Sequence, residues 1–594
     1  MTREDKGRNR DQQADEPNAE MPPESNGPAL DRRQFLGGAA GATAGAMAGG
    51  VAGLTALSAG AEELAPDSGV HRRNKAFKLR HDLAIRQKQK GVAPVTFNGD
   101  EQLYAGQNYI GNYSKGLPHD AVTGEVDPAA YEALRDAVDD GTLGAFASVP
   151  KAGIFNQLNP IGGLGFNLVG PDTRALPAPP PPALASPELA AQAAELYWMA
   201  LLRDISFLDW DTDPLVAQAC ADLSAMPGYE GPRSSGGAGP VTPAELFRVD
   251  FPGVLDGPML SQFLMFGYVQ DGILVAETKC RTPLPGQDFI TDYQEWINCR
   301  NGFPGGNPGF SGVFDPVFRF PRNPRDLGNV AGNDVIYSSY VRSFLVITNL
   351  FGALRDQNLP YPANGTFGFA TLGVADLLSQ LGTAPQGERV TWYSKWNLHR
   401  FLRPEEYGGL VHRVVADGAD YPIHPSLLNS PVLPLVFDAN EARNAARGLG
   451  ADNGTYLLPQ MFRSGCPTHP SYPAGHAYSA GACVTILKAW LNEDTLFPAT
   501  RIPTADGTAF TSAPAQFTIG GELNKLAHNL SFGRDMSGLH WRSDDVAGLL
   551  QGEAWSIDFL VECANTYPEP FEGFELTRFD GTRLVVTADG AVPA

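Results

Sequence analysis

The sequence predicts a mainly α-helical protein whose helices are joined by long irregular loops. Apolar residues recur at helical spacing in several long segments, and strictly alternating strand patterns are few. The chain contains 66 glycines and 49 prolines among its 594 residues, which explains the loops, because both residue types interrupt regular structure. The segments predicted to be helical are 188–207, 333–355, 366–402 (one or two helices), 474–491 and 541–564.

The composition is that of a folded, acidic protein. Hydrophobic residues make up 43% of the chain and charged residues 19%, and the formal net charge is −22. The acidic surplus argues against a nucleic-acid partner, because neutralising phosphates requires an excess of Lys and Arg. It also argues against binding to an anionic membrane surface. The length is compatible with several ordinary domains or with one large helical enzyme domain.

Residues 1–61 are predicted to be a disordered N-terminus followed by a twin-arginine signal peptide. Arg32 and Arg33 precede an apolar pair and a Gly/Ala-rich stretch that ends near Ser58, and residues 59–61 (AGA) suit signal cleavage. A transmembrane anchor is the alternative, which is less favoured because Gly and Ala insert weakly into membranes. We therefore expect a periplasmic or secreted protein without stable membrane insertion after cleavage.

Proline and cysteine give further expectations for the mature chain. Residues 177–182 predict an extended polyproline connector, and residues 301–330 predict a long loop. None of the six cysteines forms a C-x-x-C motif, and export permits disulfides. The pairing stays open, with Cys280 and Cys299 favoured only by their proximity in sequence.

Three clusters of residues carry the candidate chemistry, and the first is residues 392–405 (WYSKWNLHRFLRPE). Pro404 is expected to end a helix near Leu402 or Arg403. On one continuous helix Lys395 and Arg403 would lie about 80° apart, so both cations could reach one phosphate-like anion. The alternative is a solvated basic face.

The second cluster is residues 468–477 (THPSYPAGHA), directly before a predicted helix. The free N–H groups at a helix N-terminus attract anions, and Gly475 lets the backbone approach a ligand closely. His476 would bring a titratable imidazole to the same place. The alternative is a histidine that only caps the helix.

The third cluster is residues 532–544 (FGRDMSGLHWRSD). A turn near Gly538 would let Arg534 and His540 face one ligand. Asp544 follows His540 by four residues, so its carboxylate could orient the imidazole. The alternative is a core histidine satisfied by Asp544. None of the ten histidines forms H-E-x-x-H or a zinc spacing.

The three clusters, in this order, resemble the vanadium-dependent haloperoxidases and the related acid phosphatases, whose pattern is K-x6/7-R-P, S-G-H and R-x5-H-x3-D. This chain has Lys395-x7-Arg403-Pro404, Ala474-Gly475-His476 and Arg534-x5-His540-x3-Asp544. The x7 spacing is similar to the algal bromoperoxidase branch. Further similarity to that branch lies in NGDEQLY (98–104), KGLPHD (115–120), YWMALLRD (197–204) and RFLRPEEYGGLVH (400–412).

The resemblance implies a fold of two four-helix bundles with long loops, in a single catalytic domain over residues 62–594. It implies vanadate as the cofactor, phosphate as a competitor for its site, and no haem or flavin. It also implies a homodimer or a larger homo-oligomer. The site residues that it implies are His540 as the vanadium ligand; Lys395, Arg403, Arg534 and the Gly475 N–H on the vanadate oxygens; His476 as the acid–base residue; Asp544 as the partner of His540; His469 and Trp392 in the pocket; and Asp334 as a weaker candidate for a carboxylate that pairs with His476 or with an arginine.

One position departs from the pattern of the family, because Ala474 stands where the family usually has serine. Losing one neutral hydrogen bond to the anion costs on the order of 1 kcal/mol, about fivefold in affinity or rate. We therefore expect a weakened or retuned enzyme that still functions.

The implied reaction is the oxidation of bromide or iodide by hydrogen peroxide, which gives hypohalous acid that halogenates small organic substrates. The alternative enzyme is an acid phosphatase that uses the same site, with His540 as nucleophile. A third possibility is a protein that only binds vanadate or phosphate, which an intact acid–base histidine at position 476 disfavours.

Overall fold

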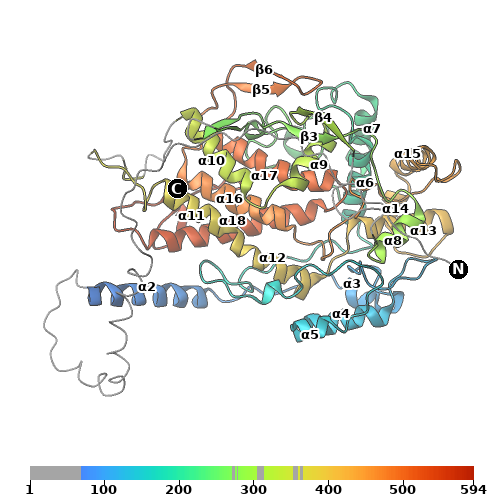
Figure 1. Ribbon diagram of the computed structural model, residues 1–594, viewed down its shortest axis with the longest axis horizontal. Helices are drawn as coiled ribbons and strands as arrows, with labels where there is room; N and C mark the ends of the chain where they lie inside the picture. Colours follow the sequence, from blue (N-terminus) through green and yellow to red (C-terminus); the bar gives the residue numbers. More distant parts are fainter. Residues whose placement is uncertain (1–68, 271–273, 277, 304–312, 352–358, 362–364) are drawn as a thin grey trace, which may run out of the picture. The chain divides into compact units, whose positions relative to one another are not determined.

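The computed structural model describes residues 69–270, 274–276, 278–303, 313–351, 359–361 and 365–594. The predicted signal segment, residues 1–61, lies outside this range. The chain divides into two compact units, residues 1–80 and 81–594, and the description below concerns the second unit. Element labels follow Figure 1.

Three long helices near the C-terminus form the centre of this unit (Figure 1). They are α16 (Gly475–Trp490), α17 (Ile519–Met536) and α18 (Arg542–Ala564). Every residue of α16 except His476 is buried, so this helix runs through the core. Glycines let α16 and α18 approach closely, because a β-carbon at Gly481 or Gly552 would collide with the main chain of the other helix.

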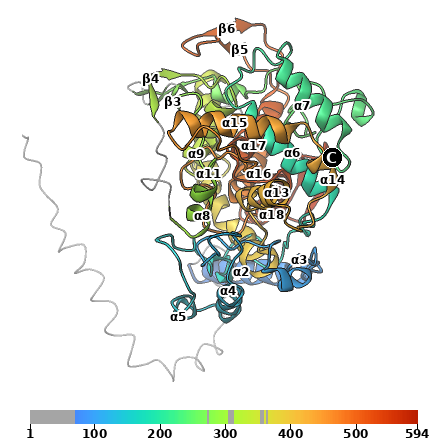
Figure 2. The ribbon, with the colours of Figure 1, turned by 90° about the vertical axis from the view of Figure 1, so that its right-hand side faces the viewer.

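Other helices of the second unit pack around the three central ones, and α2 runs from the first unit into the second. In Figure 2, α6 lies beside α14 and α15. The remaining α-helices are α2 (Gly69–Lys90), α3 (Asp100–Leu103), α4 (Pro128–Asp140), α5 (Leu143–Phe146), α6 (Pro187–Leu201), α7 (Pro214–Ala225), α8 (Tyr293–Arg300), α9 (Pro324–Asn333), α10 (Ser338–Phe351), α11 (Val374–Thr383), α12 (Arg389–Tyr393), α13 (Pro404–Asp417), α14 (Pro425–Leu428) and α15 (Val432–Ala446). Short 3₁₀ or π turns are η2 (Ala105–Gln107), η3 (Gly162–Leu164), η4 (Ser235–Gly237), η5 (Gln262–Leu264), η7 (Ala384–Glu388) and η8 (Ser394–His399).

The strands are short and form small antiparallel sheets at the periphery (Figure 1). The pairs are β1 (Tyr268–Gln270) with β2 (Leu274–Ala276), β3 (Cys280–Pro283) with β4 (Phe314–Arg319) and β5 (Thr500–Pro503) with β6 (Phe510–Ala513), and a three-stranded sheet joins β7 (Phe574–Thr577), β8 (Arg583–Val586) and β9 (Ala591–Pro593). The mainly α prediction is confirmed.

One predicted loop is wrong in part. Residues 301–330 contain β4 and most of α9. The side chain of Asn323 caps α9 by accepting from the Asp326 N–H at 2.9 Å, and Pro324 occupies the first helical position. An Asn-Pro pair is a recognised helix start, so the sequence did contain a signal for this helix.

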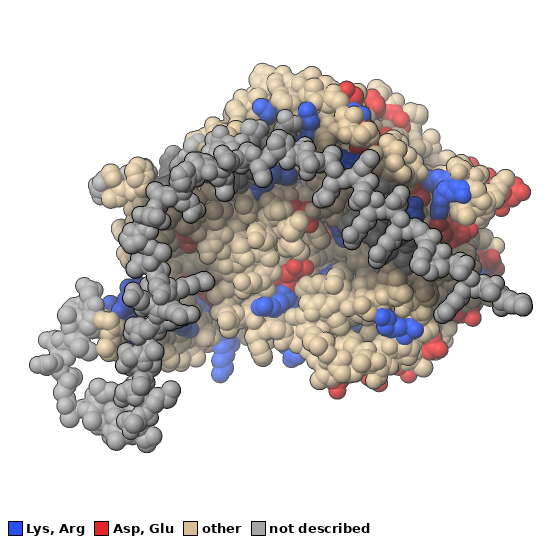
Figure 3. All heavy atoms as spheres, viewed as in Figure 1, with Lys and Arg blue, Asp and Glu red and all other residues tan. Residues whose placement is uncertain are grey.

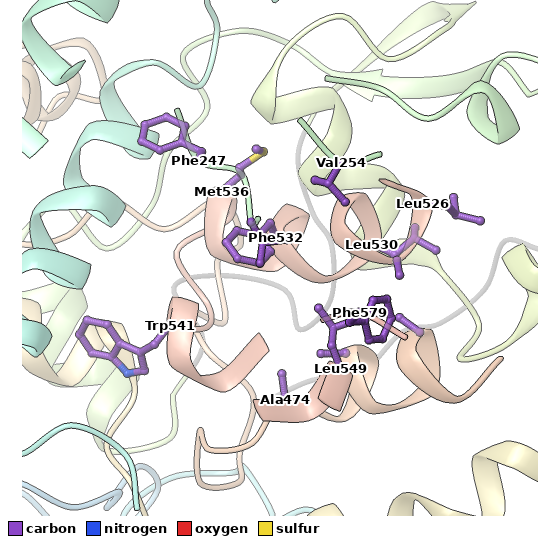
Figure 4. Close-up of a cluster of buried hydrophobic side chains, with 14 of the residues drawn as sticks. Phe247, Val254, Ala474, Leu526, Leu530, Phe532, Met536, Trp541, Leu549 and Phe579 are labelled. Atoms are coloured by element: carbon purple, nitrogen blue, oxygen red, sulfur yellow. The ribbon is translucent and has the colours of Figure 1, made fainter. Parts of the chain in front are cut away.

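A large hydrophobic core joins the central helices, and Figure 4 shows part of it around α17 and α18. Ala474 is fully buried and belongs to this cluster. All six cysteines lie in the described part of the chain and carry free thiols, so the favoured Cys280–Cys299 pair is wrong. Cys280 lies on β3, whereas the Cys299 thiol contacts Glu405 and the carbonyl of Ser464.

The surface carries charges of both signs. On the described residues of the face in Figure 3, basic and acidic side chains are scattered between uncharged ones. No helix among the described residues has both the length and the apolar character that crossing a membrane requires.

Candidate active site

The first cluster is not one helix. Lys395 lies in the π-helical turn η8, and Arg400 ends that turn with a left-handed backbone (φ 39°). Arg403 then precedes α13, and Pro404 begins that helix, so the prediction that Pro404 ends a helix is wrong. The two cations therefore come from separate elements, and their approach is a result of tertiary folding.

The second cluster lies directly against both cations. Lys395 Nζ donates to the carbonyl of Ser471 at 2.7 Å and to that of Pro470 at 3.2 Å. Arg403 Nε donates to the carbonyl of His469 at 2.9 Å. Both side chains are fully buried, so these main-chain carbonyls replace the water that the cations lose.

Arg403 also joins the second cluster to the third. Its Nη1 donates to the Leu539 carbonyl at 2.9 Å and lies 3.0 Å from Nε2 of His540. The predicted turn between Arg534 and His540 is present, since α17 ends at Met536 and Gly538 adopts a φ of 82°. The geometry thus brings all three clusters to one place.

Asp544 fixes the orientation of His540. The Asp544 Oδ2 lies 2.8 Å from Nδ1 of the imidazole and also accepts from the Trp541 N–H at 3.1 Å and from the Ser471 hydroxyl. This network assigns the ring proton to Nδ1, which leaves a lone pair on Nε2. A histidine in this tautomer can bind a metal centre through Nε2.

His476 lies in the first turn of α16, one residue after Gly475. The main-chain carbonyl of Asp334 hydrogen-bonds to its ring. The Asp334 carboxylate instead accepts from the hydroxyls of Ser339 (2.5 Å) and Ser338 (3.1 Å). Asp334 therefore lies beside His476 through its main chain, whereas the sequence led us to expect its carboxylate to pair with His476 or with an arginine.

His469 and Trp392 pack together beside Arg403. Their ring centroids are 5.0 Å apart, and Arg403 Nη2 lies 2.9 Å from Nδ1 of His469. Trp392 is part of α12. These two rings form an aromatic wall next to the cations.

The electrostatics of the site favour an anion. Burial, together with Arg403, holds the pKa of Lys395 well below its usual value and lowers the pKa of Arg534 to about 10. Arg534 Nε has no hydrogen-bond partner among the described residues. A bound oxyanion would relieve the repulsion between these cations and give Arg534 an acceptor.

The same burial affects the other titratable groups of the site. It holds the pKa values of His540 and His469 well below the usual range, with Arg403 as the next cause. It lowers the pKa of His476 to about 3, with help from Arg534, and raises the pKa of Asp544 to about 6. The three imidazoles are therefore neutral at neutral pH.

Two residues of the site were not identified from the sequence. Ser471 contributes its carbonyl to Lys395 and its hydroxyl to Asp544, and nothing in the sequence distinguishes it from other loop serines. Glu388 places its carboxyl against Gly475, since a β-carbon at Gly475 would collide with Oε1. A glutamate seven residues before Lys395 gave no motif that could have revealed it.

Fold and site together define a class: a helical-bundle protein with a buried cluster of cations suited to an oxyanion, beside which one imidazole nitrogen carries a lone pair that can act as a ligand. Residues 440–561 match the family described as VCPO second helical-bundle domain.

Comparisons with whole chains are more specific. The chain is 36% identical to a vanadium-dependent bromoperoxidase of Ascophyllum nodosum over 88% of its length and 94% of the relative. It is 32% identical to that of Corallina pilulifera over 88% of its length and the whole of the relative. The homohexameric structure of the second vanadate-dependent bromoperoxidase of Ascophyllum nodosum superposes with a TM-score of 0.81 at 32% identity, covering 88% of this chain and 91% of that one. The chain therefore belongs to the family of vanadium-dependent bromoperoxidases.

Proposed function

We propose that this protein uses bound vanadate to oxidise bromide, and also iodide, with hydrogen peroxide. The halide loses two electrons, the peroxide is reduced to water, and the hypohalous acid formed halogenates small organic compounds. The family supports the reaction. The observation that carries the proposal to this chain is the His540 Nε2 lone pair, which lies in a pocket of buried cations.

The residues of the pocket fit a phosphate-shaped anion. Lys395, Arg403 and Arg534 would neutralise its oxygens, the free N–H of Gly475 would donate to one of them, and His540 would bind the vanadium. Bound vanadate would supply a Lewis-acidic centre that activates peroxide without a change of oxidation state, so haem and flavin are not required.

His476 is suited to accept the proton of hydrogen peroxide. With its pKa lowered to about 3 the imidazole is neutral, and the Asp334 carbonyl accepts a hydrogen bond from one ring nitrogen. The other nitrogen carries a lone pair that can act as a base, and a bound oxyanion would strengthen that base because it offsets Arg534 and Lys395, two of the causes that lower the pKa. His469 and Trp392 form the neighbouring wall, where we place the approach of peroxide and halide.

Phosphate is a tetrahedral oxyanion like vanadate, so we expect it to compete for the same cations. An acid phosphatase, with His540 as nucleophile through the same Nε2, is the second candidate function. The same tautomer would serve both reactions, and the family of the whole chain favours the first.

One experiment separates the two reactions. The purified protein is incubated with orthovanadate, and peroxide-dependent bromination of a phenolic dye is measured beside hydrolysis of a phosphate ester. Bromination that requires vanadate and is inhibited by phosphate supports the proposal. Hydrolysis without bromination would instead identify a phosphatase. If neither activity is detected, the protein only binds the anion.

We further propose that the protein is exported by the twin-arginine route and forms a homo-oligomer. The twin-arginine pattern of residues 32–33 supports export, and the Ascophyllum nodosum relative described as homohexameric supports assembly. Export is tested by replacing Arg32 and Arg33 with lysine and following cleavage, and assembly by light scattering of the purified protein.

A further inference from the structure

The carboxyl group of Glu388 lies at the N-terminal end of α16. Glu388 is the last residue of η7, which packs on α16 directly before α12. A β-carbon at Gly475 would collide with Glu388 Oε1, so the carboxyl fills the space that a side chain at the first position of α16 would take. That position is next to the N–H groups to which we assign the oxyanion.

The surroundings of Glu388 leave its carboxyl available for a ligand. The residue is half-buried, and Lys395 acts on its carboxyl only through its charge, without an ion pair among the described residues. Trp392 on α12 hydrogen-bonds to the carboxyl, Lys395 on η8 is the cation that acts on it, and Tyr478 on α16 is the other titratable group coupled to it. Burial outweighs Lys395 and raises the pKa of Glu388 to about 7.

If the Glu388 carboxyl were ionised, it would repel an oxyanion bound at the N–H of Gly475, because both groups would be negatively charged and close together. A protonated carboxyl avoids that repulsion and offers an O–H donor. The neighbouring Ala474 is fully buried and has no hydroxyl that could donate to the anion.

We propose that Glu388, in its protonated form, donates a hydrogen bond to the bound oxyanion and so replaces the hydroxyl that Ala474 lacks. This inference rests on the proposed function, because vanadate is the oxyanion in question. Glu388 is then a residue that determines the affinity for the cofactor. An anion bound beside it should keep it protonated to higher pH, and raising the pH should expel the anion.

The test measures vanadate binding directly, by equilibrium dialysis of the vanadium-free protein with orthovanadate at pH 6 and pH 8.5. Four proteins are compared: the wild type, Glu388→Gln, Glu388→Ala and the control Glu132→Gln on the exposed side of α4. Glu388→Ala should bind about fivefold more weakly than the wild type at pH 6, the value of one lost hydrogen bond. Glu388→Gln keeps an N–H donor at every pH, so it should bind like the wild type at pH 6 and more tightly at pH 8.5.

Vanadate itself changes its protonation state between pH 6 and pH 8.5, and this change affects all four proteins equally. Affinities are therefore compared between proteins at the same pH. Equal affinity of Glu388→Ala and the wild type at pH 6 would overturn the inference. So would a Glu388→Gln protein with the pH dependence of the wild type. Circular dichroism of each variant confirms the fold, and the conservative Gln variant keeps the test valid if the Ala variant unfolds.

A second substitution tests the replacement itself. Introduced into Glu388→Ala, the substitution Ala474→Ser should recover most of the lost affinity for vanadate. Introduced into the wild type, it should raise the affinity less, because Glu388 already donates a hydrogen bond to the anion. Equal gains in both backgrounds would show that the two donors act independently and would contradict the replacement. If the wild type binds no vanadate, the proposed function is refuted. If the wild type binds vanadate and the Glu388 variants bind it equally well, only this inference is refuted.

Discussion

At the scale of single residues, His540 is held from both ring nitrogens, by Asp544 at Nδ1 and by Arg403 at Nε2. Replacing it removes the proposed ligand and leaves the cations in place. We expect His540→Ala to lose vanadate-dependent bromination to the background level while keeping the wild-type circular dichroism spectrum. His424→Ala, which alters only the cap of the short helix α14, is the control and should retain full activity. A near wild-type rate of His540→Ala would refute the ligand assignment.

Ala474 gives the second prediction at this scale. Serine differs by one hydroxyl, and the free N–H groups of α16 begin at the next residue. We expect Ala474→Ser in the wild-type background to raise bromide oxidation or vanadate retention by up to about fivefold, the value of one neutral hydrogen bond. The rate of bromination after removal of free vanadate measures this. A large loss would show that the pocket is arranged differently around this position.

Single residues also show how far the sequence could predict the site. Lys395, Arg403, Gly475, His476, Arg534 and His540 were identified because motifs record the spacing of side chains that share a ligand. Ser471 was not, because it acts on Lys395 through a main-chain carbonyl that any residue could supply. The same limit explains Asp334, whose carbonyl and not its carboxylate faces His476.

At the scale of elements, the sequence predicted α16 and α18 close to their observed bounds because their apolar spacing is repeated over several turns, but it did not predict α17, the third of the central helices. The prediction also failed between Lys395 and Arg403, where Arg400, with a left-handed backbone, ends a π-helical turn and α13 begins only at Pro404. The Arg400 guanidinium pairs with Glu101, almost three hundred positions away in sequence, so tertiary contacts accompany this break. Local patterns contain no information about such a distant partner.

The contact between α16 and α18 gives a prediction about stability. A β-carbon at Gly552 would collide with the main-chain carbonyl of Tyr478, which cannot move without displacing α16. We expect Gly552→Ala to lower the free energy of unfolding by about 1–3 kcal/mol, as overpacking of a core does. Urea unfolding measures the loss. Gly382→Ala, on α11 with open space around its position, is the matched control and should be neutral or stabilising, because alanine favours a helix.

At the scale of the whole molecule, a buried pair of carboxyl groups links stability to pH. Asp535 on α17 and Asp545 on α18 hydrogen-bond to each other, and none of their four oxygens receives a donor from another described group. Burial raises both pKa values, that of Asp545 to about 8; the Asp545 carboxylate raises that of Asp535 further, and Asp544 raises that of Asp545. The pair therefore holds a proton in the folded state that the unfolded chain releases near pH 4.

The sign of the effect follows from this difference. Because the folded carboxyls bind protons more tightly, their contribution to stability is complete below about pH 4 and is lost as the pH rises through about 8, at up to about 1.4 kcal/mol per pH unit for each proton. The variant Asp545→Asn needs no shared proton, so the wild type should lose stability relative to it between pH 6 and pH 9. Urea unfolding at each pH measures both proteins, and taking the difference removes the contribution of groups that titrate alike in both, such as the buried histidines. If the free energies of unfolding of the two proteins depend on pH in parallel across this range, the pair holds no extra proton. The junction of α17 with α18, which positions Arg534 and His540, would then have to be stabilised in another way.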